Sequence, residues 1–229
     1  MLDPRLPFLA CPRYWLIFSL WFLLALSSVE LAPELLARTE KQFGIEAKNR
    51  LIHWQEVLAS TDTDAIARLN RVNRFFNAIQ FIDDIDHWKK VDYWATPIEM
   101  LTTNGGDCED FSIAKYLTLI ALGVPEQQLR ITYVKALNLN QAHMVLTYFA
   151  TPDAEPLVLD NLIDDIRPAS ERTDLLPVYS FNGSDLWLAK ERSQGQLVGK
   201  SDRLSMWNDV MTRLAKDFKR APFLKNKQE

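Results

Sequence analysis

Cysteine, histidine and glycine are scarce in this chain of 229 residues, which contains two, three and seven of them. With so few glycines and 48% apolar residues, the composition suits one compact domain with an ordinary core rather than a disordered chain. Clustered Lys and Arg are also missing, and the net charge is −4. This balance speaks against nucleic-acid binding, which needs cationic side chains opposite the phosphates.

The N-terminus carries an uncharged apolar run at residues 14–26, preceded by two arginines, which is the order of the regions in a signal peptide. The run is shorter than the roughly 20 residues that a membrane span needs. Pro33 would obstruct cleavage after Ala32, so we predict either a signal peptide or an N-terminal membrane segment over residues 1–32. A buried N-terminal helix is the alternative, although no charged residue interrupts the run to give it an outer face.

Cys108 becomes the only cysteine if residues up to 25 or 32 are removed, because Cys11 leaves with them. No internal disulfide is then possible. An unpaired thiol is a liability in an oxidising compartment unless it is buried or used. Cys108 is therefore either a small buried hydrophobe or a functional thiol.

The first part of the remaining chain is predicted to be helical. Apolar residues at spacings of three and four indicate an amphipathic helix over about 33–59 and a second helix that starts near Asp62 or Thr63. The inward positions of the two helices are predicted to be Phe43, Ala47, Leu51, Trp54 and Leu58, and then Ile66, Leu69, Val72, Phe76 and Ile79.

Two further helices surround a pair of glycines. Thr96 to Glu99 has the pattern of a capping box with Pro at the first helical position, and it opens a short helix that ends at Gly105-Gly106. A longer helix follows from about Cys108 to Gly123, where Gly and then Val-Pro is a typical stop. This places Cys108 in the first turn of a helix.

Beyond this helix the hydrophobic period changes to two, which is typical of strands. Helices followed by an antiparallel sheet predict the α+β class, in one domain over 33–229. The strands are expected at Leu129–Leu137, His143–Ala150, Pro156–Asn161, Val178–Asn182 and Asp185–Lys190, and a last helix at about 202–219.

Cys108 has the surroundings of a nucleophile. A thiolate attacks, so a catalytic cysteine needs a lowered pKa or an adjacent base. In the first turn of a helix, free backbone N–H groups and the helix dipole stabilise a thiolate and a neighbouring oxyanion. The preceding glycines would let a substrate backbone approach.

A base for Cys108 has to come from three histidines. His53 lies beside the apolar stripe of the first helix, and His87 lies in an acidic turn. His143 starts a predicted strand after the cysteine helix, and Asp160 ends the next strand, where it can fix the imidazole tautomer if the strands are adjacent. Alternatively, His143 is structural and Asp160 is a turn residue or a cap.

The segments Gly106-Asp107-Cys108-Glu109-Asp110-Phe111, Ala142-His143-Met144-Val145 and Leu157-Val158-Leu159-Asp160-Asn161 together resemble the bacterial transglutaminase-like cysteine proteinases of the LapG type. The resemblance spans roughly residues 33–220. It implies a papain-like, transglutaminase-related fold in which the helix that bears the nucleophile packs on the antiparallel sheet. It also implies the roles of nucleophile for Cys108, general base and acid for His143, and orienting carboxylate for Asp160.

The same resemblance implies a cellular location, a metal requirement, a substrate and a regulatory partner. The family is periplasmic and calcium-dependent, and it cleaves the N-terminal region of a large surface adhesin, typically at a di-alanine sequence, which releases the adhesin and disperses a biofilm. An inner-membrane receptor that binds cyclic di-GMP sequesters the protease. Asp107 and Glu109 correspond to the family's calcium-linked acids.

The acids around Cys108 pose a physical problem. Asp107, Glu109 and Asp110 raise the pKa of a neighbouring thiol and oppose the helix dipole. A hard cation such as Ca²⁺, which takes about six to eight oxygen ligands, would cancel the repulsion. The alternative is that acids at a helix start only complement the dipole. Other acidic groups are interpreted as solvated turns: Asp83, Asp84 and Asp86, and Asp164 and Asp165.

Two other functions remain open. The same residues can transfer an acyl group to an amine rather than to water, which would make the protein a transamidase. A non-catalytic module that binds an adhesin or a receptor is the second alternative, with Cys108 merely buried.

Overall fold

The computed structural model describes residues 30–189 and 195–217. The predicted apolar run at residues 14–26 lies outside these ranges, so the division at residue 32 stays a prediction. Within them, no helix is both long and apolar enough to span a membrane. The first part is helical, as predicted, with α1 (Pro33–Phe43), α2 (Ile45–Leu58), α3 (Ala65–Asn77), α4 (Asp84–His87), α5 (Pro97–Thr103) and α6 (Cys108–Ala121).

An antiparallel sheet of seven strands follows the helices, in the order β6-β5-β4-β3-β7-β8-β9. A separate parallel pair is formed by β1 (Gln80–Phe81) and β2 (Gly105–Gly106). In the chain, β2 comes directly before α6. The strands of the sheet and the last helix are β3 (Leu129–Ala136), β4 (Gln141–Tyr148), β5 (Leu157–Leu159), β6 (Arg167–Pro168), β7 (Leu175–Phe181), β8 (Asp185–Leu188), β9 (Gln196–Lys200) and α7 (Ser205–Asp217).

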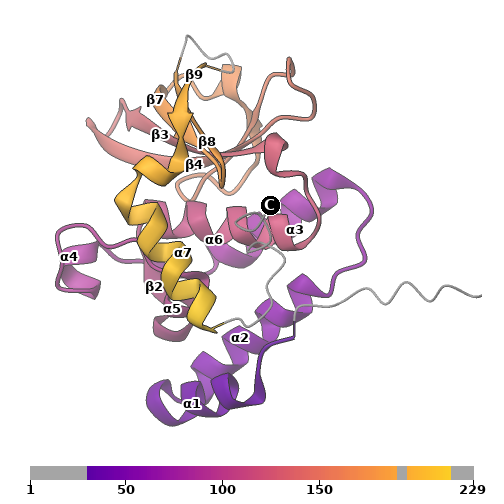
Figure 1. Cartoon of the computed structure of the whole chain (residues 1–229), viewed down its shortest axis with the longest axis vertical. Helices are drawn as coiled ribbons and strands as arrows, with labels where there is room; N and C mark the ends of the chain where they lie inside the picture. The colour runs from indigo at the N-terminus through magenta and orange to yellow at the C-terminus, as the bar shows by residue number, and fades with distance from the viewer. Residues whose placement is uncertain (1–29, 190–194, 218–229) are drawn as a thin grey trace, which may run out of the picture.

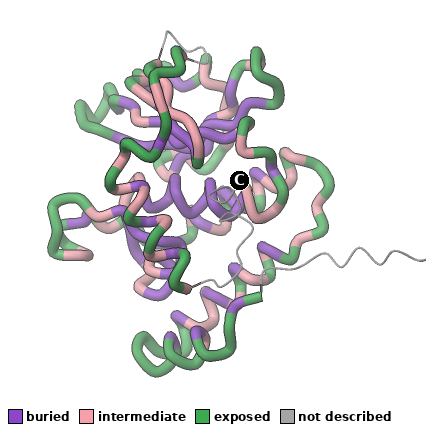
Figure 2. Tube along the Cα trace, in the orientation of Figure 1, coloured by how far each residue is buried: buried purple, intermediate pink, exposed green. Residues whose placement is uncertain are grey.

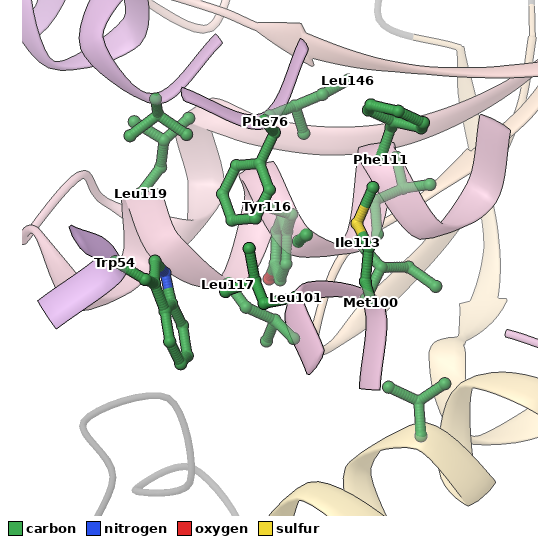
Figure 3. Packing of buried hydrophobic residues seen from close by; sticks show 14 of the residues in the cluster. Trp54, Phe76, Met100, Leu101, Phe111, Ile113, Tyr116, Leu117, Leu119 and Leu146 are labelled. Atoms are coloured by element: carbon green, nitrogen blue, oxygen red, sulfur yellow. The ribbon is translucent and has the colours of Figure 1, made fainter. Parts of the chain in front are cut away.

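Helix α6 is the centre of the core. Figure 1 shows it between the sheet at one end of the molecule and α1 and α2 at the other. Every residue from Asp110 to Leu119 is buried (Figure 2), as expected of a helix that is apolar on nearly all faces. Figure 3 shows Phe76, Met100 and Leu146 packed around it.

The two faces of the sheet differ in what covers them. Ile131 of β3 and Leu146 of β4 belong to the large cluster around α6, whereas Val134 and Val145 belong to a small cluster on the other face. Phe111 and Leu117 of α6 pack in the large cluster, so α6 covers one face of the sheet.

Three local predictions were wrong. The expected continuous helix over 33–59 is two helices, because Gly44 adopts a φ of 88° between them, a conformation that glycine accepts without strain. Phe43 and Ile66 were expected in the core and are exposed. Strands β6 and β9 were not predicted. β6 has only two residues, too few to show an alternation of apolar and polar side chains, and β9 is largely exposed.

Candidate active site

Cys108 is the first residue of α6, as the sequence predicts. Asp107 is the N-cap, and it forms a reciprocal capping box with Asp110. The Oδ1 atom of Asp110 also accepts a 2.6 Å hydrogen bond from the backbone N–H of Ala95. A Cβ atom on Gly106 would approach Asp110 Oδ2 to 2.6 Å, so only glycine lets the chain pass the buried carboxylate and enter the helix.

His143 and Asp160 form a buried pair. His143 Nε2 lies 2.7 Å from Asp160 Oδ1, and the backbone N–H of Leu162 donates to the same oxygen at 3.1 Å. Nη2 of Arg172 donates to Asp160 Oδ2 at 2.7 Å. Burial opposes ionisation, but these hydrogen bonds prevail and lower the pKa of Asp160 to about 2.

Cys108 and His143 line one cleft of about 530 Å³ where the start of α6 meets the start of β4. Because His143 Nε2 is held by Asp160, Nδ1 is the ring nitrogen left for the thiol. The thiol itself donates a 3.1 Å hydrogen bond to Glu109 Oε2. The structure thus brings the three predicted residues together, and their chemical roles stay predictions.

The other two histidines do not reach this cleft. His53 is exposed on α2. His87 Nε2 lies 2.8 Å from Thr103 Oγ1, and burial lowers the pKa of His87. Of the three histidines, only His143 lines the cleft with Cys108.

Five carboxylates converge beside the thiol, two more than the sequence predicted. One group joins Asp84, Asp92 and Glu109, and another joins Asp84, Asp107 and Asp110, each with ligand atoms within 4.8 Å of one another. The interpretation of Asp84 as a solvated turn residue was wrong, because it is only 4% exposed. Asp83 and Asp86 on either side are exposed, as are Asp164 and Asp165.

The negative charges of these clustered carboxylates are not balanced by neighbouring cationic groups in the described part of the chain. Burial, together with repulsion from neighbouring acids, raises the pKa of Asp84 to about 6 and that of Asp107 to about 10. The same causes raise the pKa of Asp110 well above its usual range. One oxygen of Asp84 and one of Asp107 find no hydrogen-bond partner among the described residues. Such a set of oxygen donors fits a hard cation.

The thiol shares this negative environment. Burial, the carboxylate of Glu109 and then Asp107 raise the pKa of Cys108, and a backbone hydrogen bond with Met144 works in the opposite direction. The acids next to Cys108 therefore favour the neutral thiol over the nucleophilic thiolate.

Comparison with known proteins places these features in a family. The model of the bacterial transglutaminase-like cysteine proteinases (BTLCP) matches residues 46–187. The chain belongs to this family. No curated protein matches it.

Solved structures of Legionella pneumophila LapG are similar to this proteinase over most of its length. The EGTA-treated form has 43% sequence identity and a TM-score of 0.69, and covers 79% of this chain and 96% of its own. The calcium-bound form has 43% identity and a TM-score of 0.67, with 79% and 98% covered. The predictions of a transglutaminase-like α+β fold and of a cysteine protease are confirmed.

Arg213, which the sequence analysis did not single out, is hydrogen-bonded to the segment that forms one side of the cleft. Arg213 of α7 donates to the backbone carbonyl of Trp94 and to Glu99, and at 2.9 Å to the hydroxyl of Tyr93. Glu99 belongs to the capping box of α5. The C-terminal helix thereby holds the segment that carries Trp94 at the cleft, and nothing in the local sequence around Arg213 signals this contact.

Proposed function

We propose that this proteinase is a calcium-dependent periplasmic endopeptidase that cleaves the N-terminal region of a large surface adhesin at a di-alanine site and so promotes biofilm dispersal. The observation that carries the catalytic part is the single cleft lined by both Cys108 and His143, with Asp160 hydrogen-bonded to the imidazole. Family membership and the likeness to LapG support the choice of a protein substrate.

His143, Cys108 and Asp160 each have a separate role in the proposed peptide hydrolysis. Nδ1 of His143 takes the proton of the Cys108 thiol, and the thiolate attacks the peptide carbonyl carbon. The backbone N–H of Cys108, at the start of α6, donates to the oxyanion of the tetrahedral intermediate. The imidazolium returns the proton to the leaving amine, and a water activated by His143 then hydrolyses the thioester. Asp160 keeps Nε2 protonated and the ring oriented throughout.

Calcium would be held by Asp107, Glu109 and Asp110, as the sequence predicts, together with Asp84 and Asp92, which only the fold brings to them. When bound, the ion supplies positive charge beside Cys108. Oε2 of Glu109 accepts the hydrogen bond of the Cys108 thiol. A Glu109 carboxylate that held calcium would leave this thiol free to pair with His143.

The place of action and the partners of the protease complete the proposal. Export by the N-terminal segment, with or without a retained membrane tether, puts the enzyme in the periplasm. There an inner-membrane receptor that binds cyclic di-GMP in the cytoplasm would sequester it from the adhesin. The resemblance to LapG-type proteinases supports both statements.

The decisive experiment mixes the purified protein with the N-terminal segment of a large adhesin from the same genome, in calcium and in EGTA. We expect cleavage in calcium only, and none with Cys108→Ala, which should still bind the segment. Replacing the di-alanine by di-valine is the matched substrate control. Incorporation of a labelled amine in place of hydrolysis would identify a transamidase, and cleavage that survives Cys108→Ala would overturn the assignment.

A further inference from the structure

Two asparagine side chains of α3 are hydrogen-bonded to the loop that follows β5. Asn73 and Asn77 lie four residues apart on the helix, so they share one of its faces. Nδ2 of Asn73 donates to the backbone carbonyl of Asp164 at 2.8 Å. Nδ2 of Asn77 donates to the backbone carbonyl of Asp160 at 2.9 Å and to Oδ1 of Asp164 at 3.0 Å. Both ends of the segment 160–164 are therefore fastened to one helix.

The side-chain amides of these asparagines bind the loop as donors only. A backbone carbonyl and a carboxylate both accept, so the atom of Asn77 that lies between them is the amide nitrogen. The Oδ1 atoms of Asn73 and Asn77 have no hydrogen-bond partner among the described residues. A buried oxygen without a partner is unfavourable, and an apolar side chain would avoid this cost. What the two positions gain from asparagine is the contact with the loop.

The loop depends on these contacts. Within the part of the chain that the structure describes, residues 161–165 make no hydrogen bond from backbone to backbone. The carboxylate of Asp160 is bound by His143 and Arg172, whereas its backbone carbonyl accepts from Asn77. Leu162 of the same loop lines the cleft that contains Cys108. The asparagines thus hold the backbone of a loop that belongs to the candidate active site.

Helix α3 also packs against α6, the helix that begins with Cys108. Leu69, Val72 and Phe76 of α3 belong to the large apolar cluster around α6, and Figure 3 shows Phe76 in this cluster. One side of α3 therefore contacts the helix of the nucleophile, and its asparagines contact the loop that begins with Asp160. The position of the loop relative to α6 is set through α3.

We propose that Asn77, supported by Asn73, is a positioning residue that sets the place of Asp160, and through it the imidazole of His143, relative to α6. The role rests on the proposed function, in which His143 is the base for Cys108. Without the bond to its carbonyl, Asp160 moves with the loop, and its 2.7 Å contact with Nε2 of His143 is lost in a larger fraction of molecules. The imidazole is then less often in the orientation that proton transfer requires.

The first test observes the contact of His143 with Asp160 without any substrate. In the full protein with ¹⁵N-labelled histidine, the Nε2 proton of His143 should exchange slowly with solvent, because its hydrogen bond is buried. Asn77→Ala should accelerate this exchange at least roughly tenfold, since it allows local opening. Asn70→Ala is the matched control on the same helix, because Nδ2 of Asn70 donates to the carbonyl of Ile66 within α3, and it should leave the rate unchanged.

Two results of the exchange experiment would overturn the proposal. One is an unchanged rate at His143 in Asn77→Ala. The other is an equal acceleration at the backbone amides of α2, which do not contact the loop through these asparagines, because it would show a general loss of stability instead of a local one.

The second test measures cleavage of the adhesin segment in calcium. Asn77→Ala should lower kcat roughly tenfold and leave KM nearly unchanged, because Asn77 is not among the described residues that line the cleft. Asp164→Ala removes one of the two acceptors of Asn77 at an exposed residue. It should have a smaller effect in the same direction, and it tests the proposal even if Asn77→Ala does not fold.

The two tests separate this proposal from the proposed function. An unchanged kcat in both variants contradicts the positioning role while the protease assignment stands. A wild-type protein that does not cleave the segment, but whose His143 proton exchanges faster in Asn77→Ala, contradicts the proposed substrate and supports the positioning of Asp160.

Discussion

Nη2 of Arg172 lies 2.7 Å from Oδ2 of Asp160, and both side chains are almost completely buried. The contact ties the loop after β6 to the carboxylate that is hydrogen-bonded to His143. Removing one partner of such a buried pair leaves the other charge without compensation.

Arg172→Met should therefore lower both stability and activity. We expect a loss of about 3–5 kcal/mol in the free energy of unfolding. The pKa of Asp160 should rise from about 2, so the acid limb of kcat/KM against pH moves to higher pH. Arg172→Lys should restore part of the stability and less of the activity, because an ammonium lacks the guanidinium fork.

The matched control for Arg172 is Arg167→Met. Arg167 pairs with Asp165 at 3.4 Å, and both side chains are largely exposed. Removing this pair should change stability by less than about 1 kcal/mol and leave the pH profile in place. If the two variants behave alike in urea and in the pH profile, Arg172 has no special role.

Asp84 and Asp86 lie on the same short helix and differ in burial, which makes them a matched pair for calcium binding. Asp84→Asn should weaken calcium binding at least roughly tenfold, because it removes a charged ligand from the converging acids. The amide oxygen can still accept from the N–H of Tyr93 as the carboxylate does. Asp86→Asn should bind calcium with the affinity of the wild-type protein. Isothermal titration calorimetry measures the calcium affinities of the two variants. Equal affinities would exclude Asp84 as a ligand.

Stability without calcium should fall as the pH rises. The pKa of Asp84 is raised to about 6 and that of Asp107 to about 10, so the folded protein binds more protons than the unfolded chain above about pH 4. Urea unfolding in EGTA should show this decline from about pH 5 to pH 8. Calcium should remove much of it, since the ion binds the ionised carboxylates of the folded state; a decline of the same size with calcium would contradict the site.

Lys115→Met should stabilise the protein. Lys115 is 1% exposed, and its ammonium has no hydrogen-bond partner among the described residues. Burial lowers its pKa to about 7. Below this pH the fold carries a buried charge, so the variant should gain roughly 1–3 kcal/mol.

The gain from Lys115→Met depends on pH in a defined direction. Between the folded pKa of about 7 and the unfolded value near 10.4, the unfolded chain binds the extra proton, so the wild-type protein recovers stability as the pH rises. The difference between variant and wild type in urea unfolding should shrink over this range. A difference that grows with pH would show that the ammonium is stabilised in the fold.

Local signals predicted the parts of the site that lie within a few residues of one another. The capping box at Thr96, and Cys108 at the first position of α6, follow from side chains that satisfy nearby backbone groups, so a short stretch of sequence contains all the information. The same kind of reasoning missed the break between α1 and α2 at Gly44. A glycine inside a helical pattern can either continue the helix or end it, and the neighbouring residues do not distinguish the two.

The amino-acid sequence by itself determined the order of elements, helices before an antiparallel sheet, and the positions of Cys108, His143 and Asp160 on them. Only the tertiary structure decided that Asp84 and Asp92 join the acids at α6 and that Arg172 holds Asp160. Spacing along the chain encodes which face of a helix or strand a residue occupies. Which distant carboxylates and guanidinium groups meet depends on how the helices and the sheet pack, and no local pattern records it.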